Sequence, residues 1–278
     1  MDLKVGLLGL GTVGAQVAER VLGKRAEILE RTGVDIDLRR ILVRDLQRPR
    51  GLPAEMITGR PEDILDDPAI QVVVEVMGGE EPARDDLERA IRSGKHGVTP
   101  TKVVMAKHGP DLLELASWRD VEGSLEAAVG GGIPLISTFK VDLIANDIER
   151  IAAVINGTTN YVLGRMAAGA EFDEAVAEAQ AAGYAEADPS SDVDGFDAAY
   201  KLAILASIAI GARIHPDPVF REGIRDVEPP DFRYARELGY YSKQLPASAR
   251  PPRRLRAPAH PPHTPTHPPP PPPSRPPT

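Results

Sequence analysis

The chain has 278 residues, enough for about two domains, and its apolar residues are mostly aliphatic because aromatic residues make up only 4%. A formal net charge of −8 argues against nucleic acids and anionic membranes as partners, and the absence of cysteine excludes disulfides and cysteine-zinc sites. No secretion signal and no apolar run of the roughly 20 residues that a membrane helix needs can be found, so we expect a soluble, cytoplasmic protein.

The first predicted elements are a buried strand over residues 4–10 and a helix over residues 15–22, joined by the pattern Gly9-x-Gly11-x-x-Gly14. In such a strand–turn–helix unit the first glycine permits a tight turn and the second lets the backbone approach a pyrophosphate. The third lets the helix pack on the strand, and the helix amides face the phosphates. The pattern predicts a dinucleotide site that contains Gly9, Gly11, Thr12, Val13 and Gly14.

A second strand is predicted over residues 34–43, and the residues after it bear on the choice of cofactor. Arg44 stands where a dinucleotide-binding fold places an acid for the ribose hydroxyls, so it could bind the 2′-phosphate of NADP. Asp45 argues for NAD instead, and an exposed loop without a ligand would account for both residues. Arg48 and Arg50 add positive charge, which favours NADP and leaves NAD open.

Strands and helices continue to alternate along the N-terminal half. Strands are predicted at 71–77 and 95–102, the second including its exit loop, and a helix is predicted at 80–91. A further helix at 105–118 is expected to be interrupted or restarted at Gly109 and Pro110. Alternation of this kind with glycine loops predicts a doubly wound parallel sheet.

The segment 123–134 contains three consecutive glycines, which bring backbone close to a ligand or an ion. A strand is predicted at the end of 144–155, followed by a helix that begins at Tyr161 with Asn160 or Thr159 as its N-cap. The helix at 172–182 ends at Gly183, a residue type common after helix C-termini.

Polar, turn-rich residues 183–201 lead directly into a very apolar helix at 202–210. Asp197 and Lys201 are four residues apart and therefore share a helix face. One interpretation is a capped helix with a surface ion pair. The other is a functional lysine at the solvent-exposed end of a buried helix face.

Composition changes sharply near residue 245. More than half of the 28 prolines follow, and Pro268–Pro273 form an unbroken run. Residues 246–278 are therefore expected to be disordered or in a polyproline II conformation. A ligand for proline-binding domains and a non-native end are both compatible with this composition.

Together these motifs resemble homoserine dehydrogenases over residues 3–243. The resemblance rests on the glycine loop and on six further motifs, Glu75-Val-Met-Gly-Gly79, Thr99-x-x-Lys102, Glu126–Pro134, Asn156–Tyr161, Gly183–Pro189 and Asp192–Lys201. It implies an α/β fold, with a Rossmann-type NAD(P)-binding domain at 1–125 followed by an incomplete α+β substrate-binding and dimerisation domain at 126–245. The tail at 246–278 would follow.

The activity implied by the resemblance is the reversible, NAD(P)H-dependent reduction of L-aspartate 4-semialdehyde to L-homoserine, in threonine and methionine biosynthesis, by a homodimer. The resemblance implies that Lys201 donates the proton and that Asp197 and Glu186 bind the substrate. It places Lys102 between cofactor and substrate, and Gly183 against the cofactor. Backbone carbonyls would bind a monovalent cation, Na⁺ or K⁺, and those residues are Glu126, Val129, Gly131 and Ile133.

Three departures from the family pattern stand out. Pro100 and Thr101 replace Ala-Asn before Lys102, and because proline fixes φ and lacks an amide, this loop could be displaced. Tyr200 stands where histidine is common. After Tyr241 the family's apolar elements give way to proline and arginine, and no regulatory domain follows, so feedback by threonine is not expected. The alternative is therefore an NAD(P)-binding protein of the same fold with impaired catalysis.

Overall fold

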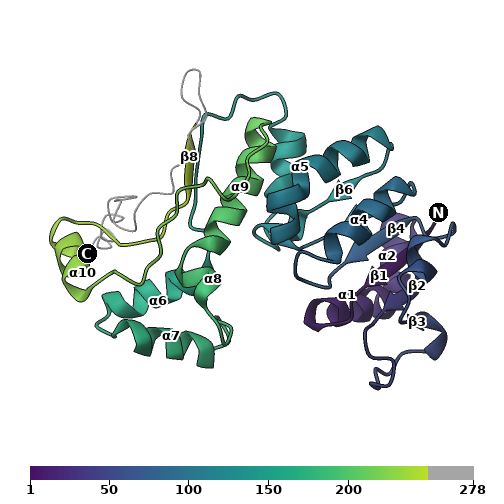
Figure 1. Ribbon diagram of the computed structural model, residues 1–278, viewed down its shortest axis with the longest axis horizontal. Coiled ribbons are helices and arrows are strands. Elements are labelled where there is room, and N and C mark those ends of the chain that lie inside the picture. The colour runs from purple at the N-terminus through teal and green to yellow at the C-terminus, as the bar shows by residue number, and fades with distance from the viewer. Residues whose placement is uncertain (250–278) are drawn as a thin grey trace, which may run out of the picture. The chain divides into compact units, whose positions relative to one another are not determined.

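The computed structural model describes residues 1–249, so the expectation of a disordered tail at 250–278 falls outside the described residues. The chain forms two compact units, Met1–Ile144 and a second unit that begins at Ala145 (Figure 1). The boundary predicted from the motifs, between residues 125 and 126, stays a prediction.

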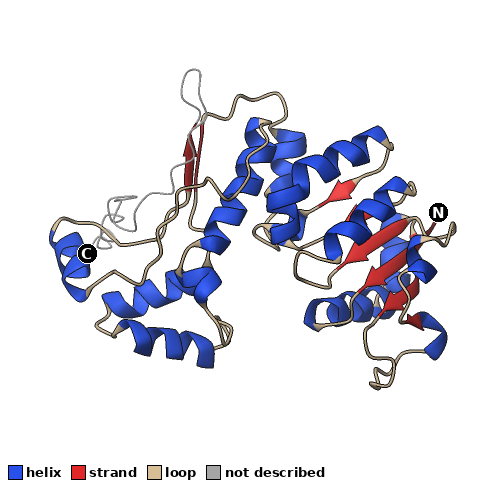
Figure 2. Cartoon of the chain, viewed as in Figure 1, coloured by secondary structure: helices blue, strands red, loops and turns tan. Residues whose placement is uncertain are grey.

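The first unit contains the parallel sheet that the alternating pattern predicts. Its six strands lie in the order β3-β2-β1-β4-β5-β6 and every neighbouring pair is parallel (Figure 2). The strands are β1 (Asp2–Leu8), β2 (Asp35–Leu42), β3 (Ile57–Thr58), β4 (Val72–Glu75), β5 (His96–Val98) and β6 (Gly123–Ser124). The helices are α1 (Thr12–Gly23), α2 (Arg25–Thr32), α3 (Glu62–Leu65), α4 (Ala83–Arg92) and α5 (Lys102–Trp118).

Helices cover both faces of this sheet, as the doubly wound fold requires. Leu7 and Leu8 are adjacent in β1 and fully buried, and their side chains point to opposite faces. Leu7 belongs to a cluster with Ala18 of α1, whereas Leu8 packs with Ile64 of α3 and Ala90 of α4. The near-continuous apolar sequence of β1 therefore results from burial on both sides.

The expected interruption at Gly109 and Pro110 is wrong, because α5 runs through both residues without a break. A proline inside a helix costs about 3 kcal/mol, since it removes one hydrogen bond and crowds the preceding turn. Buried side chains flank it on both sides, including Met105 and Leu112. Each contributes roughly 1.5–3 kcal/mol, so packing against the sheet outweighs the local preference.

In the described part of the second unit, residues 145–249, helices are the main regular elements and one small antiparallel sheet is present. The strands β7 (Arg150–Ala152) and β8 (Ala247–Ala249) pair with Ile151 opposite Ser248. The helices are α6 (Gly157–Ala167), α7 (Phe172–Ala181), α8 (Ser190–Val193), α9 (Phe196–Ile210) and α10 (Pro229–Glu237). None of the helices in the described part of the chain is long and apolar enough to span a membrane.

Two expectations for the second unit need correction. The N-cap of α6 is Asn156, whose side chain accepts a hydrogen bond from the Thr159 amide, rather than Thr159 or Asn160. The disorder expected from Pro246 is wrong for residues 246–249, since Ala247–Ala249 form β8. These three small residues all have an amide to donate, and the consecutive prolines begin only after them.

Candidate active site

The three glycines of the loop between β1 and α1 have separate structural roles. Gly9 has φ +105°, and a Cβ there would lie 2.9 Å from the Val76 carbonyl oxygen. At Gly14 a Cβ would lie 2.2 Å from the Gly9 carbonyl oxygen, so the helix could not pack as closely on the turn. At Gly11 a Cβ would meet nothing within 4 Å. Packing thus accounts for two of the glycines, and the open space at the third suits a ligand.

That open space lies at the N-terminus of α1, where Gly11 is the N-cap and no side chain caps the helix. The first-turn amides of a helix have no intrahelical acceptor, and the helix dipole favours an anion there. Thr12 and Val13 are both exposed, and Val13 keeps 53% of its surface accessible despite being apolar. The chemistry of the site fits a dinucleotide pyrophosphate, and the assignment of these five residues to it stays a prediction.

Arg44 and Asp45 follow β2 on the surface, and Arg44 is exposed. Asp45 is engaged locally, because its Oδ1 accepts a hydrogen bond of 2.9 Å from the Gln47 amide. One of its two carboxylate oxygens therefore takes part in closing the turn. The exposed guanidinium of Arg44 is the better placed of the two to meet a ligand at this end of the strand.

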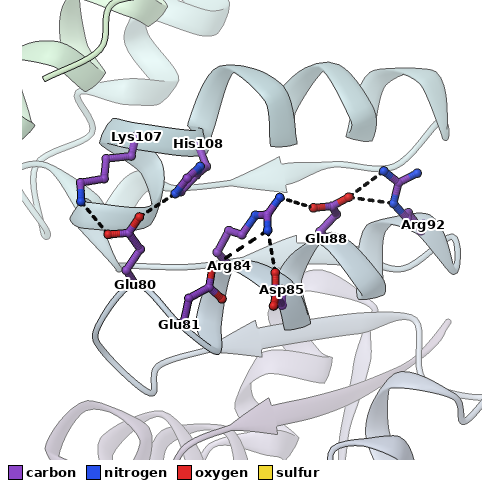
Figure 3. A network of polar contacts seen from close by, with 8 residues as sticks. All are labelled: Glu80, Glu81, Arg84, Asp85, Glu88, Arg92, Lys107 and His108. Atoms are coloured by element: carbon purple, nitrogen blue, oxygen red, sulfur yellow. Dashed lines mark hydrogen bonds and ion pairs between the residues drawn. The ribbon is translucent and has the colours of Figure 1, made fainter. Parts of the chain in front are cut away.

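Lys102 is the first residue of α5, and its side chain is partly buried. The segment after Gly78 and Gly79 is joined to the same helix by Glu80 (Figure 3). One Glu80 oxygen lies 2.6 Å from Lys107 Nζ, and the other lies 2.8 Å from His108 Nε2. These hydrogen bonds, that of Lys107 first, hold the pKa of Glu80 below its usual value. The loop after β4 and the start of α5 are thereby linked.

The remaining ion pairs of Figure 3 run along α4. Arg84 pairs with Glu88 at 3.0 Å, and Glu88 pairs with Arg92 at 2.6 Å. Since between 24% and 57% of each side chain remains exposed, solvent screens each pair and it contributes little stability. We regard them as a solvated helix face without a role in the site.

The four residues with the predicted cation-binding carbonyls lie on one short segment that includes η2 (Glu126–Ala128). The Glu126 carboxylate closes this segment by accepting hydrogen bonds from the Ile136 amide at 3.0 Å and the Ser137 amide at 2.9 Å. Gly130 and Gly132 have positive φ, so the backbone turns sharply between Val129 and Ile133. Carbonyl oxygens are suitable ligands for Na⁺ or K⁺. Within residues 1–249, no three acidic or histidine side chains form a metal cluster.

In the second unit, Asp197 and Lys201 form a buried ion pair on α9. Lys201 Nζ lies 2.6 Å from Asp197 Oδ2 and donates to the Ile155 carbonyl at 2.8 Å. Only 1% of the Asp197 side chain and 17% of the Lys201 side chain are exposed. The interpretation as a surface ion pair is therefore wrong.

Asn156 joins this pair and was missed by the sequence analysis as a site residue. Its Nδ2 donates to Asp197 Oδ2 at 2.8 Å and to Asp192 Oδ1 at 2.7 Å. Its Oδ1 caps α6 at the Thr159 amide. The position before Gly-Thr-Thr signals an N-cap. No local pattern shows that the same side chain bridges two acids 36 and 41 residues further along.

Gly183 and Glu186 lie in the exposed turn after α7, and Gly183 has φ +76°. The turn is fixed to α6 by the Thr158 hydroxyl, which donates to the Tyr184 carbonyl at 2.6 Å. The Glu186 backbone carbonyl accepts from Gln180, and its carboxylate reaches into solvent. The structure thus brings together Asp197 and Lys201, with no contact from the Glu186 carboxylate to this pair within the described residues.

The geometry around Lys201 determines what it can do. A lysine ammonium has three N–H groups, and Asp197 and Ile155 accept from two directions. The third N–H remains able to donate to a ligand oxygen through the exposed part of the side chain. The arrangement suits the transfer of a proton to an oxygen that gains negative charge.

Comparisons with known proteins show the family to which the chain belongs. Residues 134–269 match the family model described as homoserine dehydrogenase, and residues 9–125 match the model of the homoserine dehydrogenase NAD binding domain. The homoserine dehydrogenase of Synechocystis sp. is 48% identical over 250 residues, which are 88% of this chain and 57% of the relative. Residues 9–125 accordingly belong to a domain that binds a nicotinamide cofactor.

Solved structures agree in fold as well. The crystal structure of a homoserine dehydrogenase from Thiobacillus denitrificans has a TM-score of 0.87 at 42% identity, covering 94% of this chain and 61% of the other. A structure from Archaeoglobus fulgidus has a TM-score of 0.80 at 30% identity and covers 94% and 86%. The chain spans little more than half the length of the curated relatives it matches. These comparisons lend no support to the alternative of impaired catalysis.

Proposed function

Because the chain belongs to the homoserine dehydrogenase family, we propose that it catalyses the reversible reduction of L-aspartate 4-semialdehyde to L-homoserine with a nicotinamide cofactor. The observation that carries the proposal is the Lys201 ammonium, buried beside Asp197 and fixed by the Ile155 carbonyl. A lysine held in this way presents one N–H to a substrate oxygen, which is the requirement of carbonyl reduction.

Lys201 acts as the proton donor in the direction of reduction. Negative charge grows on the carbonyl oxygen as the bond to carbon is reduced, and the ammonium stabilises that charge before the proton moves. Asp197 accepts a hydrogen bond from Lys201 and orients it, and Asn156 holds the Asp197 carboxylate from the other side. In the reverse direction the neutral amine accepts the proton of the alcohol.

The cofactor, when bound, supplies or accepts the hydride. The open space at Gly11 and the amides at the start of α1 would hold its pyrophosphate, and Lys102 would lie between cofactor and substrate. Gly183 would contact the cofactor. We propose NADP as the preferred form, with NAD as the other candidate, because the Arg44 guanidinium is exposed at the end of β2 while one Asp45 carboxylate oxygen accepts from the Gln47 amide.

The remaining site assignments belong to the same proposal. Glu186, whose carboxylate reaches into solvent, would bind the substrate ammonium group. A Na⁺ or K⁺ ion would be bound by the backbone carbonyls of Glu126, Val129, Gly131 and Ile133. Assembly as a homodimer and a cytoplasmic location follow from the family and are part of the proposal.

The experiment is to measure NADPH oxidation by the full chain on addition of aspartate semialdehyde, in the wild type and in Lys201→Ala. Since removing one partner of a buried ion pair can cost several kcal/mol, Lys201→Gln is included, because its amide still donates to Asp197. Both variants should bind NADPH normally and lose turnover by about a hundredfold or more. Lys140→Ala, which removes a partly exposed partner of Glu122, is the control. Equal turnover in the wild type and Lys201→Gln, or no turnover by folded wild-type protein, would overturn the proposal.

A further inference from the structure

Two of the family motifs, Glu75–Gly79 and Thr99–Lys102, contain residues to which the proposed reaction assigns no role. Glu75 is the last residue of β4, and none of its surface is exposed. A carboxylate removed from water is strongly unfavourable unless hydrogen bonds compensate it. Glu75 accepts two such bonds, from the Met77 amide at 2.6 Å and from the Thr99 hydroxyl at 2.6 Å.

The Thr99 hydroxyl connects the buried Glu75 carboxylate to the start of α5. Thr99 follows β5 and is 5% exposed, and its own amide is fixed to the Ser124 carbonyl. A hydroxyl has one hydrogen, which goes to Glu75, so its oxygen is the acceptor for the Thr101 amide at 2.9 Å. Thr101 is the N-cap of α5 and Lys102 is the first residue of that helix. A buried acid thereby fixes the backbone that carries Lys102.

Pro100 is compatible with the hydrogen bonds that join Glu75, Thr99 and Thr101. The hydrogen bond to the Thr99 hydroxyl comes from the amide of Thr101, whereas proline removes only the amide N–H of residue 100. The hydrogen bond from Thr101 to Thr99 spans Pro100 and is intact, although the exchange of Ala-Asn for Pro-Thr suggested a displaced loop. The restricted φ of Pro100 also limits the freedom of the segment before Lys102.

We infer that Glu75 is a positioning residue, which acts through Thr99 to hold Lys102 at the site of the reaction. The inference rests on the proposed function, which places Lys102 between cofactor and substrate. It does not require Glu75 or Thr99 to touch cofactor or substrate. It assigns a shared purpose to two motifs that lie 24 residues apart and meet at the carboxyl ends of neighbouring strands.

The test compares Thr99→Val, which removes the hydroxyl, with Thr99→Ser, which keeps it. Thr58→Val is a matched control. The Thr58 hydroxyl also donates to a carboxylate, that of Asp63 at 2.5 Å, and also accepts from the amide two residues later. Both valine variants should lose similar thermal stability. Only Thr99→Val should lower kcat, by about tenfold or more, with the KM for NADPH changed less than about twofold. Thr99→Ser should restore kcat, and a kcat of Thr99→Val within about twofold of the wild type would overturn the inference.

A second measurement does not depend on turnover. The rate at which an amine-acylating reagent modifies Lys102 in the cofactor-free chain is followed by mass spectrometry, with exposed Lys24 as the internal reference. Release of the loop should make Lys102 react at least about threefold faster in Thr99→Val, and in neither Thr99→Ser nor Thr58→Val. Equal rates in all variants would overturn the inference even if the wild type reduces the aldehyde. If the wild type shows no turnover but Lys102 is still labelled faster in Thr99→Val, the inference stands and only the proposed function is contradicted.

Discussion

Replacing Asn156 by alanine tests whether the centre of the second unit depends on one amide side chain. The substitution removes three hydrogen bonds at once. Asn156 Nδ2 no longer donates to Asp192 and Asp197, and Oδ1 no longer caps α6 at the Thr159 amide. Nearly all the effect should appear as lost stability of the second unit, because no atom of the first unit is involved in these bonds.

The magnitude follows from the burial of each partner. Asp197 is 1% exposed, and a hydrogen bond to a buried charged group contributes about 1.5–3 kcal/mol. Loss of an N-cap costs about 1 kcal/mol. Asp192 is only partly buried, so water replaces most of its lost bond. Asp197 also keeps Lys201 as a partner. We therefore expect Asn156→Ala to lower the unfolding free energy by about 3 kcal/mol.

Urea denaturation of the full chain, followed by circular dichroism, measures this loss. Asn160→Ala is the control, since Asn160 is exposed on the same helix and its Oδ1 accepts from Lys243. Asn156→Asp keeps the cap but places a third carboxylate beside the other two, so it should also be destabilised. Equal stabilities of the two alanine variants, or a wild-type stability of Asn156→Asp, would refute the reasoning.

Further predictions concern the first unit. Gly14→Ala should lower the unfolding free energy by about 1–3 kcal/mol, because its Cβ would overlap the Gly9 carbonyl oxygen. Gly11→Ala should stay as stable as the wild type and bind NADPH at least about tenfold more weakly. Equal stability of the two variants would contradict the assigned roles. Arg44→Ala should raise the Kd for NADPH about tenfold and leave that for NADH unchanged, with Arg31→Ala on the exposed face of α2 as the control; equal effects on both cofactors would count against NADP. The pKa of Glu80 is lowered by its partners on α5, so its contribution to stability is present above its ordinary value of 4.5 and is lost as the pH falls below it. The difference in thermal midpoint between Glu80→Gln and the wild type should therefore shrink in acid, and a difference independent of pH would contradict this.

Features determined by local geometry could be predicted from the sequence. The glycine loop is one case, because a tight turn and a close helix contact exclude a Cβ at Gly9 and Gly14 wherever the fold occurs. The shared face of Asp197 and Lys201 is another, since helical periodicity places residues four apart together. The parallel sheet followed from the alternation of apolar strands and helices, and the structure confirms it.

Features that depend on tertiary contacts could not be predicted. Pro110 signalled a helix break, but burial of its neighbours keeps α5 continuous. Asn156 and Asp197 are 41 residues apart, and Glu75 and Thr99 are 24 residues apart. Their hydrogen bonds arise from the way strands and helices are brought together. No spacing rule connects such positions, so both polar clusters became visible only in the structure.

The pairing of β7 with β8 has a consequence for the order in which the second unit folds. The helices α6 and α7 are consecutive, and the Arg165–Glu178 ion pair joins them across few residues. The strand β7 must instead wait for β8, and the Thr159 hydroxyl waits for Gln244, which is 85 residues further along the chain. Closing so long a loop has an entropic cost, and contacts between residues far apart in the sequence therefore generally form late. During synthesis on the ribosome, α6 and α7 can dock early. The pairing of β7, the strand before Asn156, with β8 can form only after residue 249 has emerged.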